Sequence, residues 1–105
     1  MPRYVTVSKV KSLRPGRAKL VFSGDKRIAV FNDRGTFRAV DDRCTHVGAS
    51  LSEGLCEDGL VTCPWHGGKF RLSDGRGMGP PAYRSLKTYP LRILNEVLQV
   101  ELNDE

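Results

Sequence analysis

The sequence predicts an all-β fold made of short antiparallel strands, and three observations support this prediction. First, β-branched and apolar residues form short runs that are bounded by clusters of Gly, Pro, Asn and Asp. Second, apolar and polar residues alternate over positions 98–102, which is typical of a strand buried on one face. Third, no part of the sequence carries a sustained helical period.

The expected strands can be placed in chain order. They cover residues 4–7, 18–22, 27–31, 36–40, 60–63, 69–72, 89–94 and 97–102. The segment "NDRG" at 32–35 is typical of a hairpin turn, and Asn95 with Glu96 predicts a second two-residue turn in which Asn95 supplies the positive φ. Residues 50–59 are expected to hold one short helical turn at most. The glycines of segment 73–82 miss the G-x-G-x-x-G spacing, so this segment is expected to be a loop and not a nucleotide-binding turn.

Size and composition indicate a single small globular domain. The chain has 105 residues, of which 39% are hydrophobic and 28% charged. It has no run of 18 apolar residues and no apolar stretch of 7–15 residues near its start, so we expect neither a membrane span nor a signal peptide. The count of three cysteines is odd, which argues against a closed disulfide framework and favours the reducing cytoplasm.

The chain is basic, with a net charge of +5 and a pI of about 9.4. The Lys and Arg residues are scattered, and no run of five or more occurs. This distribution is typical of a solvated basic surface, and the alternative is a patch that steers an acidic protein partner. Because aromatic residues are few and the charge is dispersed, we expect no nucleic-acid partner.

The residues that carry chemistry lie in two short segments, "CTHVGAS" (44–50) and "TCPWHGGKF" (62–70). They contain both histidines of the chain and two of its cysteines. Sixteen residues separate His46 from Cys63, enough for a strand, a turn and a return. Two thiolates and two imidazoles suit either zinc or an iron–sulfur cluster. The order Cys, His, Cys, His differs from that of a zinc finger, and in a binuclear cluster it lets one iron take both thiolates and the other both imidazoles. A structural zinc site in a small binding module remains the alternative.

These segments resemble a known family. "CTHVGASLSEG" followed by "VTCPWHGGKF" resembles the signature of Rieske 2Fe-2S proteins, and "DGRGMGPPAYRSLKTYPLRI" resembles the tail that follows it. The likeness covers about residues 3–102 and is strongest to the small Rieske-type ferredoxins of bacterial aromatic-ring dioxygenase systems. The resemblance implies one 2Fe-2S cluster per chain, with Cys44 and Cys63 on one iron and His46 and His66 on the other.

The resemblance also implies a domain plan. We expect the Rieske iron–sulfur fold, in which an antiparallel β-sandwich base carries a small cluster-binding subdomain with two ligand loops. The cluster-binding part would span about residues 43–82, and the base about 1–42 and 83–105 of one domain. The segment around Pro80 and Pro81 would form a third loop that covers the cluster.

The function that the resemblance implies is one-electron transfer, so the chain would be a component of an oxidoreductase system and not itself an enzyme. We expect a monomer that accepts electrons from a flavoprotein reductase and delivers them to a terminal oxygenase or related enzyme. The alternative within the family is the small Rieske-like subunit of an NADH-dependent nitrite reductase. The oxygenase subunit itself is excluded, because it would need a second iron site and both histidines are already used.

Departures from other family members refine the expectation. Respiratory Rieske proteins carry an extra disulfide, and Ala49 and Trp65 occupy its two positions here. Gly68 and Phe70 occupy the positions of a serine and a tyrosine that donate hydrogen bonds to sulfur in those proteins. Without these donors the reduction potential should lie near the low end of the Rieske range, at about −150 mV. Cys56 lies outside the ligand pattern and is expected to be a packed or partly exposed thiol.

Overall fold

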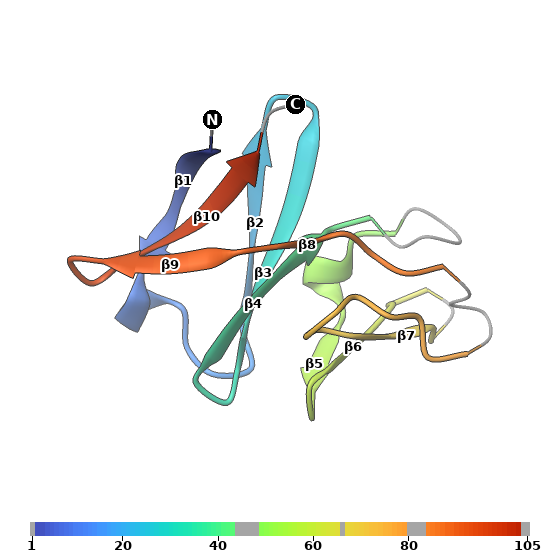
Figure 1. Ribbon diagram of the computed structural model, residues 1–105. Coiled ribbons are helices and arrows are strands. Elements are labelled where there is room, and N and C mark those ends of the chain that lie inside the picture. The colour runs from blue at the N-terminus through green and yellow to red at the C-terminus, as the bar shows by residue number, and fades with distance from the viewer. Residues whose placement is uncertain (1, 44–48, 66, 80–83, 104–105) are drawn as a thin grey trace.

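The computed structural model describes residues 2–43, 49–65, 67–79 and 84–103 of the chain (Figure 1). Ten short strands and two 3₁₀ turns make up these ranges. In chain order they are β1 (Pro2–Lys9), η1 (Val10–Ser12), β2 (Ala18–Ser23), β3 (Lys26–Asp33), β4 (Thr36–Asp41), η2 (Leu51–Glu53), β5 (Leu55–Glu57), β6 (Leu60–Thr62), β7 (Lys69–Arg71), β8 (Thr88–Tyr89), β9 (Leu91–Leu94) and β10 (Val97–Asn103). Neither 3₁₀ turn, the only helical segments in the described ranges, is long and apolar enough to cross a membrane.

The strands form three antiparallel sheets. Their orders are β1-β10-β9, β2-β3-β4-β8 and β5-β6-β7. The first two sheets form the base, and the small third sheet lies beside the base at the other end of the molecule (Figure 1). The predicted all-β antiparallel fold is therefore confirmed.

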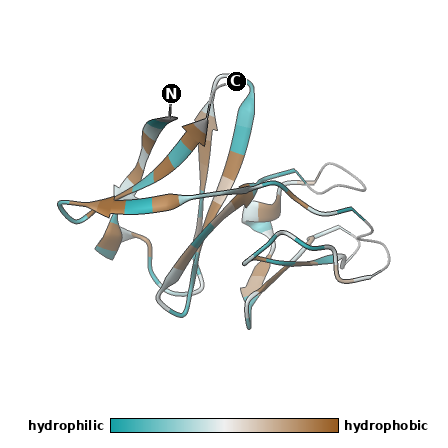
Figure 2. Cartoon of the chain, viewed as in Figure 1, coloured by the Kyte–Doolittle hydropathy of each residue, from teal (hydrophilic) through white to brown (hydrophobic). Residues whose placement is uncertain are grey.

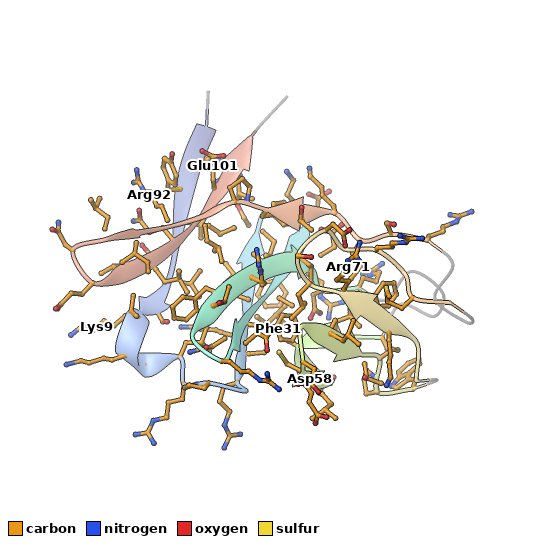
Figure 3. All side chains as sticks on the ribbon, turned by 60° about the horizontal axis from the view of Figure 1, so that its bottom comes forward. Lys9, Phe31, Asp58, Arg71, Arg92 and Glu101 are labelled. Atoms are coloured by element: carbon orange, nitrogen blue, oxygen red, sulfur yellow. The ribbon has the colours of Figure 1, made fainter. Side chains whose placement is uncertain are left out.

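Strand β3 lies between two hydrophobic cores, because its side chains alternate between its two faces. Ile28 and Val30 pack with residues of β1, β2 and β10 inside the base. Ala29 and Phe31 pack instead with residues of η2, β6 and β7, so they join the base to the small sheet (Figure 3). All four side chains are completely buried. In the sheet β1-β10-β9, hydrophobic and hydrophilic residues alternate along β10 (Figure 2).

Both predicted hairpin turns are present. Arg34 and Gly35 connect β3 to β4 with φ values of 54° and 93°, and Asn95 and Glu96 connect β9 to β10 with φ values of 51° and 65°. Two successive residues with positive φ define the turn whose twist matches that of the flanking strands. Asn95 therefore supplies positive φ as expected, and Glu96 supplies it as well.

The 3₁₀ turn η1 was not expected from the sequence, and two strand predictions also differ from the structure. Residues 50–59 hold one 3₁₀ turn, as predicted, but this turn is followed by β5, a strand that the sequence pattern did not predict. The single strand expected over 89–94 is divided at Pro90 into β8 and β9, which belong to different sheets. Proline has no N–H to donate to a sheet, whereas the carbonyl of Pro90 accepts a bond from Glu101 N at 2.8 Å. Pro90 is thus the point where the chain passes from one sheet to the other.

Candidate metal centre

Of the four residues expected to bind iron, the structure describes Cys63. It follows β6, its side chain is 1% exposed, and it packs in the core that joins the base to the small sheet. Cys44, His46 and His66 lie outside the described residues. The four-residue ligand set is therefore still a prediction, and the evidence for the centre comes from Cys63 and from the described segments around the other three.

Cys63 is held in a closed backbone turn at the end of the β6–β7 hairpin. Its N–H donates to Gly68 O at 2.7 Å, and its carbonyl accepts from Gly67 N at 3.1 Å. Gly67 has a φ of 72°, a left-handed conformation that glycine adopts without steric cost. Trp65 lies within this turn with 67% of its surface exposed. The turn therefore directs one thiol into the core while it presents an indole to solvent.

The first motif is held at its base by a buried carboxylate. Asp42 has a completely buried side chain, and its Oδ2 accepts bonds from Ser50 Oγ at 2.6 Å and from Arg27 Nη2 at 3.0 Å. Its Oδ1 accepts from Ser52 N at 2.8 Å, and its backbone oxygen accepts from Leu51 N at 2.6 Å. These bonds join Asp42, two residues before Cys44, to residues 50–52. This network could not be predicted from the sequence, because nothing in the pattern distinguishes Asp42 from Asp41.

The glycine- and proline-rich segment is anchored to β7. Gly77 pairs with Phe70 in a β-bridge, and Met78 N donates to Lys69 O at 2.9 Å. The turn before it is closed by Asp74, which accepts from Arg71 Nε at 3.0 Å. The hydrogen bond and positive charge of Arg71 hold the pKa of the Asp74 carboxyl well below its usual range. The proposed third loop therefore begins from a fixed position on the small sheet.

The residues present fit a 2Fe-2S cluster. The described segments on either side of residues 44–48, 66 and 80–83 lie at the same end of the molecule (Figure 1). Cys63 lies there among buried apolar side chains, and the hydrophobic shell around a metal site limits solvent access. A donor set of thiolates and imidazoles is the one that Rieske clusters use.

Comparison with known proteins identifies the family to which this chain belongs. The family model described as the Rieske [2Fe-2S] domain matches residues 3–90, which is most of the chain. This chain belongs to the Rieske [2Fe-2S] family, whose cofactor is a 2Fe-2S cluster.

Individual relatives indicate which members of the family are similar. The ferredoxin subunit of biphenyl dioxygenase from Pseudomonas sp. (strain KKS102) is 44% identical over 80% of this chain and 78% of its own. Among solved structures, one chain of the complex of reduced oxygenase and oxidised ferredoxin in carbazole 1,9a-dioxygenase has a TM-score of 0.89 and 30% identity, over 92% of this chain and 91% of that one. The small subunit of a putative NADH-dependent nitrite reductase from Mycobacterium tuberculosis has a TM-score of 0.88 and 27% identity, over 100% of this chain and 99% of that one.

Cys56 packs against the same hydrophobic core as Cys63 but lies outside the ligand pattern. It belongs to β5, pairs with Val61 in the small sheet, and is a half-buried free thiol, as expected. Burial, and then the negative charge of Asp33, raise the pKa of the Cys56 thiol from 9.0 to about 11. A thiol that stays protonated is a poor metal ligand, because thiolate is the form that binds metals.

Proposed function

We propose that this protein is a one-electron carrier whose Rieske 2Fe-2S cluster is held by Cys44 and Cys63 on one iron and by His46 and His66 on the other. When bound, such a cluster supplies a reversible one-electron redox couple. The observation that carries the proposal is the buried Cys63 on a closed turn, at the end of the molecule where the ends of the other candidate loops also lie. The cluster-binding part would span about residues 43–82, a range that contains the whole β5-β6-β7 sheet.

The described residues support three tasks in this role. The turn from Cys63 to Gly68 fixes the position of one thiolate. Leu51 and Phe70, both completely buried in the same core as Cys63, keep water from the protein side of the centre. Asp42 is hydrogen-bonded to Ser50 and Ser52, so the described residues on the two sides of segment 44–48 are tied to each other.

Electron transfer requires two partners, and the comparisons support the choice of one of them. Two curated relatives of this chain are ferredoxin subunits of dioxygenase systems and not their catalytic subunits, and one similar structure is a complex with an oxygenase. We therefore propose a terminal oxygenase as the electron acceptor and a flavoprotein reductase as the donor. The free protein would be a cytoplasmic monomer.

The likeness to a nitrite reductase small subunit supports a second candidate function, because it extends over the full length of both chains. In that case the electrons would pass to nitrite reduction and not to an oxygenase. Deletion of the gene in its own host separates the two candidates. Loss of oxygenation of an aromatic substrate supports the first, and loss of NADH-dependent nitrite reduction with oxygenation intact supports the second.

Metal analysis of the purified protein tests the centre itself. We expect iron and acid-labile sulfide in equal amounts, visible colour, and reversible bleaching by one electron per chain. Cys44→Ser and Cys63→Ser should abolish cluster assembly, because metal binding and folding are coupled. Cys56→Ser is the matched control and should leave the cluster intact. A colourless protein that contains zinc would overturn the proposal in favour of a zinc-stabilised binding module, and loss of iron from the Cys56 variant would overturn the ligand assignment.

A further inference from the structure

A basic cleft lies where the start of β3, the end of β4 and β8 meet. We define the basic cleft by its four cationic residues, which are Lys26, Arg27, Arg43 and Lys87. Asp25, Asp41 and Tyr89 complete its lining, and its volume is about 410 Å³. Four cations against two carboxylates leave the lining with a net charge of +2. The fold therefore brings together four basic residues that are dispersed in the sequence.

The cations of the basic cleft are largely free to bind an external group. Among the residues that the structure describes, no carboxylate forms an ion pair with Lys26, Arg43 or Lys87. Lys87 Nζ lies 5.2 Å from the centre of the Tyr89 ring, which keeps the ammonium group on the cleft wall. The carboxylate of Asp41 is already engaged, because it accepts a bond from Tyr89 Oη at 2.5 Å.

The fourth cation has a different role within the cleft. Arg27 Nη2 donates to the buried carboxylate of Asp42, and its Nε is buried without a hydrogen-bond partner. Its side chain is 31% exposed, but its charge is paired with that of Asp42, so it is not available for a full bidentate pair with an external anion. We therefore assign contact with an external anion to Lys26, Arg43 and Lys87.

The position of the basic cleft connects it to electron transfer. Arg43 directly precedes residue 44, the first residue of the Cys-x-His motif, and forms a β-bridge with Ser50 on its other side. Arg27 is hydrogen-bonded to the same Asp42 that fixes the base of this motif. A group bound in the basic cleft therefore lies beside Arg43, the residue that directly precedes the segment with two of the proposed iron ligands.

We propose that the basic cleft docks a carboxylate-bearing segment of the protein partner that exchanges electrons with this chain. This inference rests on the proposed function and adds the chemistry of the partner surface. Opposite charges that meet at an interface accelerate encounter and fix register more than they add affinity. The two carboxylates in the lining limit the net charge, which favours a few singly charged side chains over a polyphosphate.

The test uses a small oxidant of known charge and a pair of variants with equal net charge. Lys26→Glu with Lys87→Glu reverses two cations of the basic cleft. Lys9→Glu with Lys11→Glu is the matched control. Lys9 is exposed at the end of β1 (Figure 3), Lys11 is exposed in η1, and neither lines the basic cleft. Either pair of reversals lowers the formal net charge by 4, from +5 to +1. Retention of the visible spectrum and of the thermal midpoint shows that each holo-protein is folded.

The measurement is the oxidation rate of the reduced holo-protein by the hexacyanoferrate(III) trianion in a stopped-flow instrument. At about 0.01 M ionic strength, where screening is weak, the cleft variant should react roughly tenfold more slowly than the wild type. The oxidation rate of the control variant should fall much less. Hexaglutamate with blocked ends should slow oxidation of the wild type and the control variant, and should have little effect on the cleft variant.

Each outcome decides the inference. Equal losses in both variants, or no loss in either, would overturn it, because the position of the charge would then not matter. Inhibition by inorganic phosphate that equals inhibition by hexaglutamate at the same ionic strength would also overturn it in favour of a simple anion site. In every one of these cases a wild-type protein that is still reversibly reduced by one electron leaves the proposed carrier function standing, so the two failures are distinguishable.

Discussion

Arg27 Nη2 lies 3.0 Å from Asp42 Oδ2, and this ion pair joins the start of β3 to the residue that follows β4. The backbone repeats the connection, since Asp42 N donates to Arg27 O at 2.9 Å. The same carboxylate is bonded to the hydroxyl of Ser50 on the other side of the first motif. One carboxylate, that of Asp42, therefore connects the ion pair in the base to Ser50, which follows the segment that contains Cys44 and His46.

The first prediction concerns Asp42. Asp42→Asn keeps the size of the side chain but replaces one acceptor oxygen with an NH₂ donor, so that Ser50 Oγ, Arg27 Nη2 and Ser52 N cannot all donate to it. We expect a loss of about 3 kcal/mol of stability, the low end for a broken buried pair, because Arg27 is partly exposed. The temperature at which the holo-protein loses its visible colour should fall, and the cluster should be released faster to an iron chelator.

Asp74→Asn is the control for this experiment. Asp74 is also paired with an arginine, Arg71, but the pair is exposed on the surface of the small sheet. Exposed ion pairs contribute little to stability, so we expect almost no change in the bleaching temperature. Equal behaviour of the two variants would show that Asp42 is not a support of the first motif.

The Asp42 network also shows what the sequence can and cannot reveal. The two Cys-His motifs and the alternation over 98–102 are local patterns, so they predicted the family and the antiparallel sheets correctly. The pairing of Arg27 with Asp42 joins residues 15 positions apart and depends on the register of β3 with β4, which no local pattern specifies. The basic cleft has the same origin, since Lys87 reaches it only through the pairing of β8 with β4.

The second prediction concerns Gly54, at the end of η2. A Cβ atom at this position would lie 2.1 Å from Thr62 O, and the carbonyl is backbone that cannot move aside cheaply. Gly54→Ala should therefore push β5 away from β6 and cost about 1–3 kcal/mol, as overpacking does. This corresponds to a fall of roughly 5 °C or more in the thermal midpoint measured by circular dichroism.

The matched glycine is Gly24, in the turn between β2 and β3. Its surroundings are open, but its φ of 62° is one that alanine adopts at a cost. We expect Gly24→Ala to lower the thermal midpoint less than Gly54→Ala. A larger fall in the thermal midpoint of Gly24→Ala than of Gly54→Ala would show that Gly54 does not lie as close to Thr62 as in this structure.

The third prediction concerns the reactivity of Cys56. Burial, and then Asp33, raise the pKa of the Cys56 thiol from 9.0 to about 11, so at pH 8 its thiolate is roughly a hundredfold scarcer than that of an ordinary thiol. Alkylation of the holo-protein by iodoacetamide, followed by mass spectrometry of the peptide that contains Cys56, should be slower by about this factor. The rate should rise with pH to a midpoint near 11.

The raised pKa also sets the direction of the effect on stability. Folding favours the neutral thiol. The contribution of Cys56 to the free energy of unfolding is therefore complete below pH 9.0 and is lost as the pH rises toward 11. Asp33→Asn should speed alkylation only modestly, because the carboxylate is the second cause of the shift and burial is the first. Alkylation of native Cys56 at the rate of glutathione would contradict the burial of this thiol.

The last prediction concerns the reduction potential, which we expect near the low end of the Rieske range, at about −150 mV. Phe70 is completely buried in the same core as Cys63, and Gly68 accepts the backbone hydrogen bond of Cys63. Neither side chain can donate a hydrogen bond to sulfur. Phe70→Tyr and Gly68→Ser would each introduce a hydroxyl beside the turn that holds Cys63, and a donor aimed at sulfur stabilises the reduced centre more than the oxidised one.

Protein-film voltammetry of the wild type, the Phe70→Tyr variant and the double variant measures the effect. A hydrogen bond to a charged group contributes about 1.5–3 kcal/mol, of which only the difference between redox states changes the potential. Since about 59 mV corresponds to 1.4 kcal/mol for one electron, the midpoint should rise by several tens of millivolts per donor. The single variant keeps the test decisive if a side chain at position 68 prevents folding. A wild-type midpoint near +300 mV would contradict the ferredoxin type of centre. An unchanged midpoint in a folded Phe70→Tyr variant would show that this position does not face the cluster, because the hydroxyl would then have no sulfur within reach.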